Sequence, residues 1–458
     1  MIIRLSLAGV LAAAFAAGVA VVPPHINSPM SAGADTIKTI PQPSKDDRAR
    51  VEWLERSLAH DSMEGRALAS RGEHRAAVFL AAQMKKIGLK PGGDDKYFQR
   101  VPLAMMVPVP AAAGTSRGGG GGGGRGAVGV TPPECLPKAP VRSTPAPTDT
   151  AARGRGAAPG APGAGRGAVT PAPGAAGAAA ATGRGGRGGV GGAPSPVAQA
   201  PSLRRVTLPS MKDWDTVPKD RQLTAVNVIG ILPGRDPVLK NEIVVVLSHF
   251  DHLGIRTPAV PGADSIFNGA DDDAAGTVAV LEIARLLKKA GKPKRTIVFA
   301  NMTGEESGMV GTNFWVSHPT FPLSQFVAGF EIEMIGRPDS LAGGPGKAWL
   351  TGYERSTMGD MLKQYGIDIL PDRRPEQSFF QRSDNYGLAR RGIVAHTLST
   401  FNLHTDYHRA TDDVDKIDFD HMTAVIHSAA EAVRHLADGP KPAWHPGCDP
   451  SQPPPARP

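Results

Sequence analysis

The chain has 458 residues, of which 41% are hydrophobic, and this is enough for one large folded domain or two ordinary ones. Its formal net charge of +8 would suit a protein that binds nucleic acid or a membrane surface. Residues 113–203 alone carry eight arginines and one lysine against two acidic residues, so this segment accounts for nearly all of the excess. The charge therefore indicates no basic binding face elsewhere, and we expect no nucleic-acid partner.

The N-terminus has the pattern of an export signal. Arg4 precedes an apolar run of small residues and leucine at positions 5–22, and small residues that suit a signal peptidase follow. We expect residues 1–34 to be a signal peptide; if they stay uncleaved, residues 5–22 would anchor the chain in a membrane. Either alternative exports the remaining chain to the periplasm or out of the cell. A stable membrane partner is expected only in the uncleaved case.

The chain contains two cysteines, Cys135 and Cys448, both in proline-rich surroundings. An exported protein could join them in a disulfide, and the sequence leaves this pairing open. Two cysteines are too few to build a thiolate metal site.

Two segments precede the main domain. Residues 45–106 open with helical patterns, the first with Ser44 as its expected N-cap, and we assign them to the main domain as a helical lead-in. Residues 107–205 are rich in glycine, alanine, proline and arginine, and we predict a disordered insertion because they contain almost no core-forming side chains. Their RG repeats resemble RNA-binding tails in composition but lack the aromatic residues that stack on bases. RNA binding is therefore the last-ranked alternative.

Residues 206–440 form the main domain, and a proline-rich tail follows at 441–458. Continuous branched-apolar runs, typical of buried strands, alternate here with amphipathic helical patterns. The predicted strands lie in residues 224–234, 241–249, 294–302, 325–336 and 391–399, and the predicted helices in 273–291 and 419–437. This alternation predicts an α/β fold with three α/β/α layers around a mostly parallel mixed sheet. Active sites of such folds gather at the carboxyl ends of the strands.

Polar clusters occur at several of these strand ends. His249 closes one buried strand, and Asp251 follows two residues later, where it can orient an imidazole. Three adjacent aspartates, residues 271–273, precede the first predicted helix of the main domain. A helix N-cap needs one acidic residue, whereas three repel each other unless a cation lies nearby.

Further carboxylates follow the next two strands. Glu305 and Glu306 come directly after one strand, where one could bind a metal ion while the other moves a proton. Glu331 and Glu333 point to the same face of another strand, because side chains alternate along a strand. Two buried carboxylates without a partner are costly. His408 lies in the loop before the last helix and is a weak candidate by itself.

Imidazoles mixed with carboxylates suit zinc. Two zinc ions need one bridging carboxylate and two further ligands each, and the clusters together contain enough ligands for this. Such a pair of ions can polarise a carbonyl group and activate a water molecule near neutral pH.

At this point the sequence resembles the M28 family of zinc peptidases over residues 45–105 and 222–437. The order and spacing of the matching strings agree with that family. The strings are HFDHLG (249–254), FNGADDDAAGTVAVLEIARLL (267–287), GEESGMVGT (304–312), EIEMIG (331–336), RSDNYGLARRGI (382–393) and YHRATDDVDKID (407–418). Residues 57–91 look like the helical lead-in of bacterial members.

The resemblance implies a zinc-peptidase fold of the phosphorylase/hydrolase-like type and a role for each site residue. The metal ligands would be His249 and Glu333 for one zinc ion, Glu306 and His408 for the other, and Asp272 as the bridge. Asp272 is chosen among the three aspartates because the family's bridging residue stands four positions before the glycine that is Gly276 here. Glu305 would be the general base, and Asp251 would support a ligand without binding metal.

The expected function is an exported, zinc-dependent exopeptidase that acts on peptides, an aminopeptidase in the first instance. Two zinc ions and Glu305 would activate a water molecule for attack on the peptide bond. A carboxypeptidase or a glutaminyl-cyclase-like enzyme on the same fold is an alternative. A non-catalytic binding protein of peptidase shape is another, although pure binding has no need for Glu305.

Overall fold

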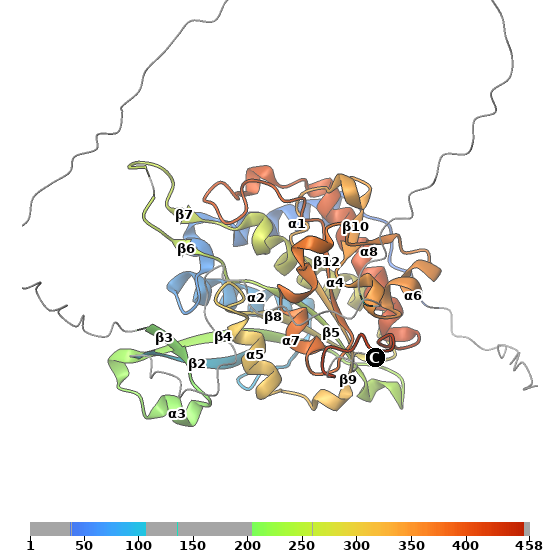
Figure 1. Cartoon of the computed structure of the whole chain (residues 1–458), viewed down its shortest axis with the longest axis horizontal. Helices are drawn as coiled ribbons and strands as arrows, with labels where there is room; N and C mark the ends of the chain where they lie inside the picture. Colours follow the sequence, from blue (N-terminus) through green and yellow to red (C-terminus); the bar gives the residue numbers. More distant parts are fainter. Residues whose placement is uncertain (1–36, 38, 107–134, 136–203, 259, 453–458) are drawn as a thin grey trace, which may run out of the picture. The chain divides into compact units, whose positions relative to one another are not determined.

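A computed structural model describes residues 37, 39–106, 135, 204–258 and 260–452 (Figure 1). The predicted signal peptide and nearly all of the predicted insertion lie outside the described residues. In the part that is described, no helix is long and apolar enough to cross a membrane.

A ten-stranded sheet forms the centre of the fold, and it is mixed, as the sequence predicted. Its four middle strands are parallel, in the order β12 (Ala395–Ser399), β9 (Phe326–Glu333), β5 (Ile243–His249) and β8 (Thr296–Met302). All four fall within runs that the sequence assigned to strands. Because these four strands run in the same direction, their carboxyl ends meet at one edge of the sheet.

Antiparallel strands extend the sheet on both sides. Next to β8 lie β4 (Gln222–Leu232), β2 (Phe98–Met106) and β3 (Arg204–Thr207), with the short β1 (Lys90–Pro91) also paired to β4. Next to β12 lies β10 (Ala348–Leu350), which runs antiparallel to β12 and parallel to β11 (Ile369–Pro371). A separate two-stranded sheet joins β6 (Gly254–Ile255) to β7 (Ile266–Phe267). The mixed sheet is thus parallel at its centre and between β10 and β11, and antiparallel elsewhere.

Four long helices cover one face of the sheet (Figure 1): α1 (Lys45–Leu58), α2 (Arg71–Ile87), α4 (Ala275–Ala290) and α8 (Phe419–Asp438). The shorter α5 (Val310–Ser317) and α7 (Asn385–Ala389) cover the other face. Two further helices are α3 (Met211–Asp215) and α6 (Met358–Gln364). Together the layers give the predicted α/β/α arrangement.

Strand β5 shows why these layers form. Every residue from Ile243 to His249 is buried. Val244 and Val246 pack in the cluster under the long helices, while Val245 and Leu247 pack in the cluster under α5 and α7. A continuous apolar run is required because side chains alternate and both faces of the sheet are covered.

The expected N-cap of the lead-in is present. Ser44 accepts a hydrogen bond from the backbone N–H of Asp47, and Asp47 accepts one in return from the N–H of Ser44. The lead-in is not wholly helical, because its last residues form β2. Pro102 interrupts the apolar pattern of this strand, which hides it from a reading of the sequence.

The two cysteines are joined in a disulfide. Cys135 belongs to the predicted insertion and is fully buried, while Cys448 belongs to the predicted tail. The tail also packs on the domain, since the indole N–H of Trp444 donates to the carbonyl oxygen of Gly392 at 3.0 Å. Removal of the whole insertion would therefore leave Cys448 without its partner.

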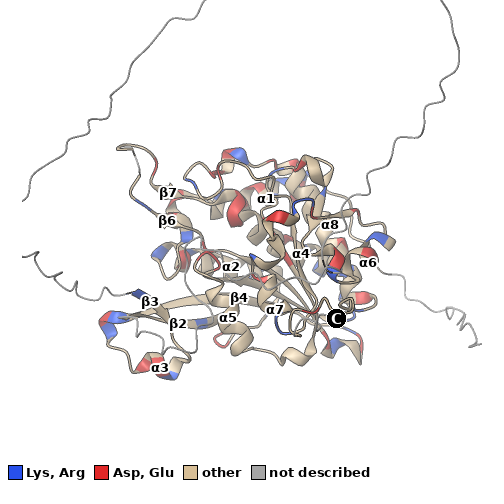
Figure 2. Ribbon diagram, in the orientation of Figure 1, with Lys and Arg blue, Asp and Glu red and all other residues tan. Residues whose placement is uncertain are grey.

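Both signs of charge are mixed over the helices around the sheet (Figure 2). On α1, for example, Arg48 pairs with Glu52 at 2.8 Å one turn further along. Such exposed pairs contribute little stability, typically about 0.3–0.5 kcal/mol each.

A candidate metal centre at the strand ends

The candidate residues come together at the carboxyl ends of the parallel strands. His249 is the last residue of β5 and Glu333 the last of β9, while Glu305 and Glu306 follow β8. Asp272 lies in a single turn, Ala270–Ala274, directly before α4. His408 reaches the same place from the loop that follows β12.

Asp272 lies between two groups of side chains. Its Oδ1 atom is 3.3 Å from Nε2 of His249, which is also 3.8 Å from Oε1 of Glu333. Its Oδ2 atom is 3.1 Å from Nε2 of His408, which is 3.2 Å from Oε2 of Glu306. The two oxygens thus face two different sets of ligands, which is the geometry required of a bridging carboxylate.

His252 joins the second group, although the sequence analysis did not single it out. Its Nδ1 atom is 2.9 Å from Oε1 of Glu306 and 3.9 Å from Oδ2 of Asp272. His252, Asp272 and Glu306 form one group of atoms with the spacing of metal ligands, and His249, Asp272 and Glu333 form the other. The chain turns after β5 ends at His249, so the alternation of a strand does not predict where His252 points. The signal in the sequence was a second histidine three residues after the candidate ligand His249.

The three adjacent aspartates have different partners. Asp271 accepts a hydrogen bond from the N–H of Gly336 at 2.7 Å, and Asp273 accepts one from the N–H of Met334 at 3.0 Å. Both therefore hold the chain just beyond β9. Asp272 faces the cluster instead, while its own N–H donates to Asp412 at 3.0 Å. Two of the three charges are explained by backbone hydrogen bonds, and the third is not.

Asp251 and Glu331 support the site from behind. Oδ1 of Asp251 accepts a hydrogen bond from the N–H of Glu305 at 3.1 Å, and the carbonyl oxygen of Asp251 lies 3.2 Å from Nδ1 of His249. A proton on that Nδ1 leaves Nε2 free to bind metal. Glu331 is fully engaged elsewhere, because its two oxygens accept hydrogen bonds from Ser383, Asp384, Asn385 and Thr397.

Local backbone conformation also fixes the carboxylates. Gly304, with φ of +70°, turns the chain between β8 and Glu305, and a Cβ there would lie 2.8 Å from Cβ of Val310. His408 has φ of 57°, a left-handed conformation that costs a non-glycine residue energy and is often found at functional sites.

The charges of the cluster are strongly coupled. Burial raises the pKa of Asp272, but the imidazoles of His249 and His408 outweigh burial and hold this pKa well below its ordinary value. Burial lowers the pKa of His408, yet the facing carboxylates of Asp272 and Glu306 raise it to about 10. For Glu305, burial and the neighbouring carboxylates of Glu333 and Glu306 raise the pKa well above its usual range. The cluster of carboxylates therefore favours a positively charged group in its midst.

The donor set fits a metal ion. Nε2 of His249, both ring nitrogens of His252 and Oε1 of Glu306 are buried and have no hydrogen-bond partner among the described residues. Buried polar atoms without partners are rare in folded proteins, and the explanation is often an ion or a water molecule. Imidazole nitrogen together with carboxylate oxygen is the mixture that zinc binds.

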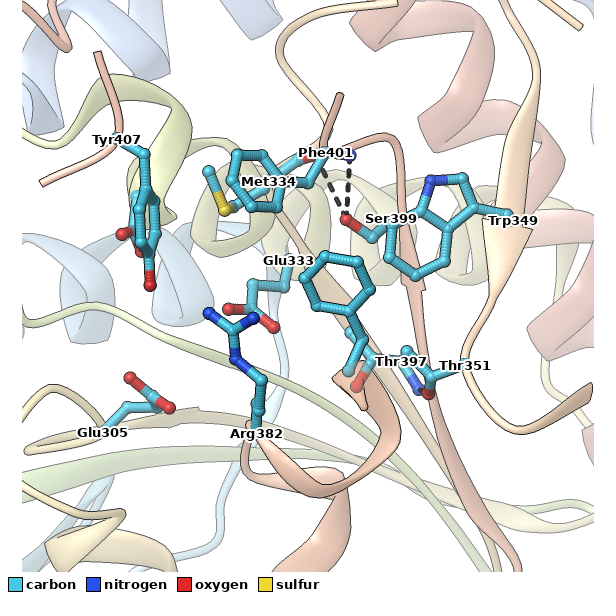
Figure 3. A pocket seen from close by; sticks show the side chains of 12 residues that line it. Glu305, Glu333, Met334, Trp349, Thr351, Arg382, Thr397, Ser399, Phe401 and Tyr407 are labelled. Atoms are coloured by element: carbon cyan, nitrogen blue, oxygen red, sulfur yellow. Dashed lines mark hydrogen bonds between the residues drawn. The ribbon is translucent and has the colours of Figure 1, made fainter. Parts of the chain in front are cut away.

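A small cavity opens beside the cluster (Figure 3). Asp272, Glu305 and Glu333 form its acidic wall. The rest of the lining is largely aromatic and apolar, with Met334, Trp349, Phe379, Phe401 and Tyr407. Arg382 points into the cavity, and its guanidinium carbon lies 5.0 Å from the centre of the Phe379 ring. The cavity can therefore hold an apolar group next to the acidic cluster.

Arg66, in the lead-in, holds the loops that present the ligands. Its guanidinium is buried and donates hydrogen bonds to four carbonyl oxygens at 2.7–2.9 Å, those of Leu58, Phe250, Asn268 and Gly269. Phe250 follows His249, and Gly269 stands three residues before Asp272. One side chain from the lead-in thus connects both ligand-bearing loops, which places the lead-in within the same folding unit.

The fold and this cluster define an α/β domain with a candidate metal centre, and comparison with known proteins gives its family. Residues 227–433 match the family model described as Peptidase family M28. The matched segment, residues 227–433, belongs to this family. It is 26% identical over 218 residues to leucine aminopeptidase 1 of Sclerotinia sclerotiorum, covering 43% of this chain and 52% of the relative. A probable leucine aminopeptidase 1 of Trichophyton verrucosum is 29% identical over 219 residues, covering 43% of this chain and 54% of the relative.

The chain spans about half the length of these curated relatives. Among solved structures, a zinc aminopeptidase from Bacillus subtilis superposes with a TM-score of 0.46 at 14% identity, covering 85% of this chain and 95% of that one.

The role of Arg66 predicts a large difference between two arginine variants. Arg66→Gln leaves several buried carbonyl oxygens unpaired and removes the positive charge nearest to the buried Glu55, so we expect the free energy of unfolding to fall by about 3–5 kcal/mol. Arg71→Gln is the matched control, because Arg71 is exposed and pairs with Glu64 at the surface; its cost should stay below about 1 kcal/mol. Urea denaturation of the metal-free variants measures both. Equal unfolding midpoints would show that Arg66 is not the connection described above.

Proposed function

We propose that this chain is an exported zinc aminopeptidase, which binds two zinc ions and removes N-terminal residues from peptides. The observation that carries the proposal is the position of Glu305. Its Oε2 atom is 4.0 Å from Nε2 of His249, further than the nearest oxygens of Asp272 and Glu333 at 3.3 and 3.8 Å, so it lies next to the proposed ligands. A carboxylate beside a metal pair, yet outside its ligand set, is placed to move a proton.

His249, Glu333 and Asp272 would hold one zinc ion, and Glu306, His408 and Asp272 the other. Bound zinc would polarise the scissile carbonyl group and lower the pKa of a water molecule. Glu305 would accept the proton of this water and later donate it to the leaving amine. Burial and the neighbouring carboxylates raise its pKa well above the usual range, and a raised pKa makes a carboxylate a stronger base.

The cavity supports action at the amino end of a peptide. Glu305 and Glu333 lie on its wall, where their negative charge would attract a free α-ammonium group. The aromatic part of the lining would hold the side chain of the N-terminal residue. An apolar N-terminal residue fits best, because burial of its side chain contributes about 1.5–3 kcal/mol.

The disulfide supports export. Disulfides persist in oxidising compartments and are rare in the cytosol, and Cys135–Cys448 joins two distant parts of the chain. The N-terminal signal predicted from the sequence agrees with this location.

A carboxypeptidase is the second candidate, because Arg382 points into the cavity. A guanidinium group can bind a free α-carboxylate through two parallel hydrogen bonds. The same catalytic group would then act at the other end of the peptide.

A substrate panel separates these functions. Purified protein is incubated with aminoacyl reporter substrates, with their N-acetylated forms as matched controls, and with N-acetylated peptides that have a free carboxyl end. We expect hydrolysis only where the amino end is free, greatest for leucine-like residues, and none after chelation of metal. Release of C-terminal residues from the blocked peptides would establish the carboxypeptidase instead. Full activity after complete chelation would rule out a metallopeptidase.

Glu305 and Glu306 are adjacent, so their variants test the two assigned roles against each other. Glu305→Gln keeps the shape of the side chain but cannot accept a proton, so turnover should fall by roughly 10² to 10⁴ while zinc content stays the same. Glu306→Gln removes an anionic ligand, so both zinc content and turnover should fall. The zinc content of each variant is measured by mass spectrometry. The opposite pattern would mean that the two roles are reversed, and two fully active variants would place catalysis elsewhere.

A further inference from the structure

We infer that His252 is itself a metal ligand, so that the second zinc position has four protein ligands and the first has three. The inference rests on the proposed two-zinc function. It adds His252 to the ligands that the family resemblance implies, and it gives the two positions different properties.

The burial of His252 is the first observation. Its side chain is completely buried, and neither ring nitrogen has a hydrogen-bond partner among the described residues. A buried polar group without a partner costs about 1–3 kcal/mol. His249 differs in this respect, because its Nδ1 atom lies 3.2 Å from the carbonyl oxygen of Asp251. Nδ1 of His252 lies 2.9 Å from Oε1 of Glu306 but without hydrogen-bond geometry, so the burial of this ring requires a further explanation.

The direction of the ring is the second observation. Nδ1 of His252 faces carboxylate oxygens of both Glu306 and Asp272, at 2.9 and 3.9 Å. Ligand atoms bound tetrahedrally to one zinc ion at roughly 2.0–2.2 Å lie about 3.3 Å apart. Both distances are close to this value. A residue that only oriented Glu306 would have no reason to face Asp272 as well.

His252 and His408 approach Glu306 from different sides. His252 is nearest to Oε1 of Glu306, and His408 is nearest to Oε2. Their rings are 5.8 Å apart, centre to centre, and inclined at 67°. The two imidazoles thus each face one oxygen of Glu306, and both also face Oδ2 of Asp272.

Four ligands and three ligands have different consequences. Zinc sites with four protein ligands are typically closed and structural, whereas sites with three keep a position open for water or substrate. The second position would have His252, His408, Glu306 and Asp272. The first would have His249, Glu333 and Asp272, and Glu305 stands beside it. Water activation would thus belong to the first position, and the second would hold its ion more tightly.

The test uses His252→Asn in the full chain. The asparagine amide can contact Glu306 in place of Nδ1 of histidine, but it is a poor zinc ligand. If His252 binds metal, the variant should lose more than about 100-fold in affinity for the tighter zinc ion, because loss of a residue that merely orients a ligand typically costs about 10–100-fold. Calorimetric titration of metal-free protein with zinc chloride measures this. His421→Asn is the matched control, since His421 is also buried but bonds to Gly346 and Thr400.

X-ray absorption of the wild-type protein at the zinc edge provides a second readout that does not depend on the variant's folding. With one zinc ion per chain, we expect scattering from two imidazoles. One imidazole per zinc, or unchanged affinity in His252→Asn, would overturn the inference while leaving the two-zinc function intact. Failure of the wild-type protein to bind two zinc ions would instead contradict the proposed function.

Discussion

Mutual repulsion of buried carboxylates is the constraint on which the site depends. Asp272, Glu305, Glu306 and Glu333 meet at one edge of the sheet, and Asp272 and Glu306 are almost completely buried. Negative charges in a low-dielectric environment repel strongly, so such a cluster needs compensating positive charge. Three imidazoles surround it, and they leave ring nitrogens without partners. Metal ions would satisfy both requirements together.

The acidic residues nearby fall into two kinds. Asp271, Asp273 and Glu331 accept hydrogen bonds from backbone N–H groups, and these bonds hold the ends of β9 and α7 in place. No backbone N–H of the described residues donates to the carboxylates of Asp272 and Glu306, and both carboxylates face imidazoles. The partner of each carboxylate, a backbone N–H group or an imidazole, therefore distinguishes structural carboxylates from candidate metal ligands. Residue type alone does not make this distinction. The lead-in contributes to the same arrangement, because Arg66 holds the loops on either side.

Much of the fold could be predicted from the sequence. Strands β5, β8 and β9 and helices α4 and α8 have long apolar patterns, because they are covered on both faces or pack on the sheet along their whole length. The carboxyl ends of the predicted strands then indicated His249, Glu305 and Glu333 as candidate site residues. Strand β2 was missed because Pro102 breaks its pattern, and the three-residue strands β10 and β11 are too short to show one.

Other features depend on contacts between distant residues. Pairing of Cys135 with Cys448 spans 313 residues, and neither local sequence signals it. The choice of Asp272 among three aspartates came from the family resemblance, since their different hydrogen bonds appear only once β9 lies beside α4. His252 was missed because it follows the end of β5, where the periodicity of the strand no longer predicts the direction of a side chain.

The central claim is that metal ions hold this acidic cluster together, with Asp272 between two of them. Anomalous X-ray diffraction at the zinc edge, from crystals of the zinc-loaded protein, tests it most directly. We expect two strong peaks about 3.5–4 Å apart, one between His249 and Glu333 and the other beside Glu306, with Asp272 bridging them. A map without peaks at the cluster, or with a single peak that leaves one of the two groups empty, would contradict the claim.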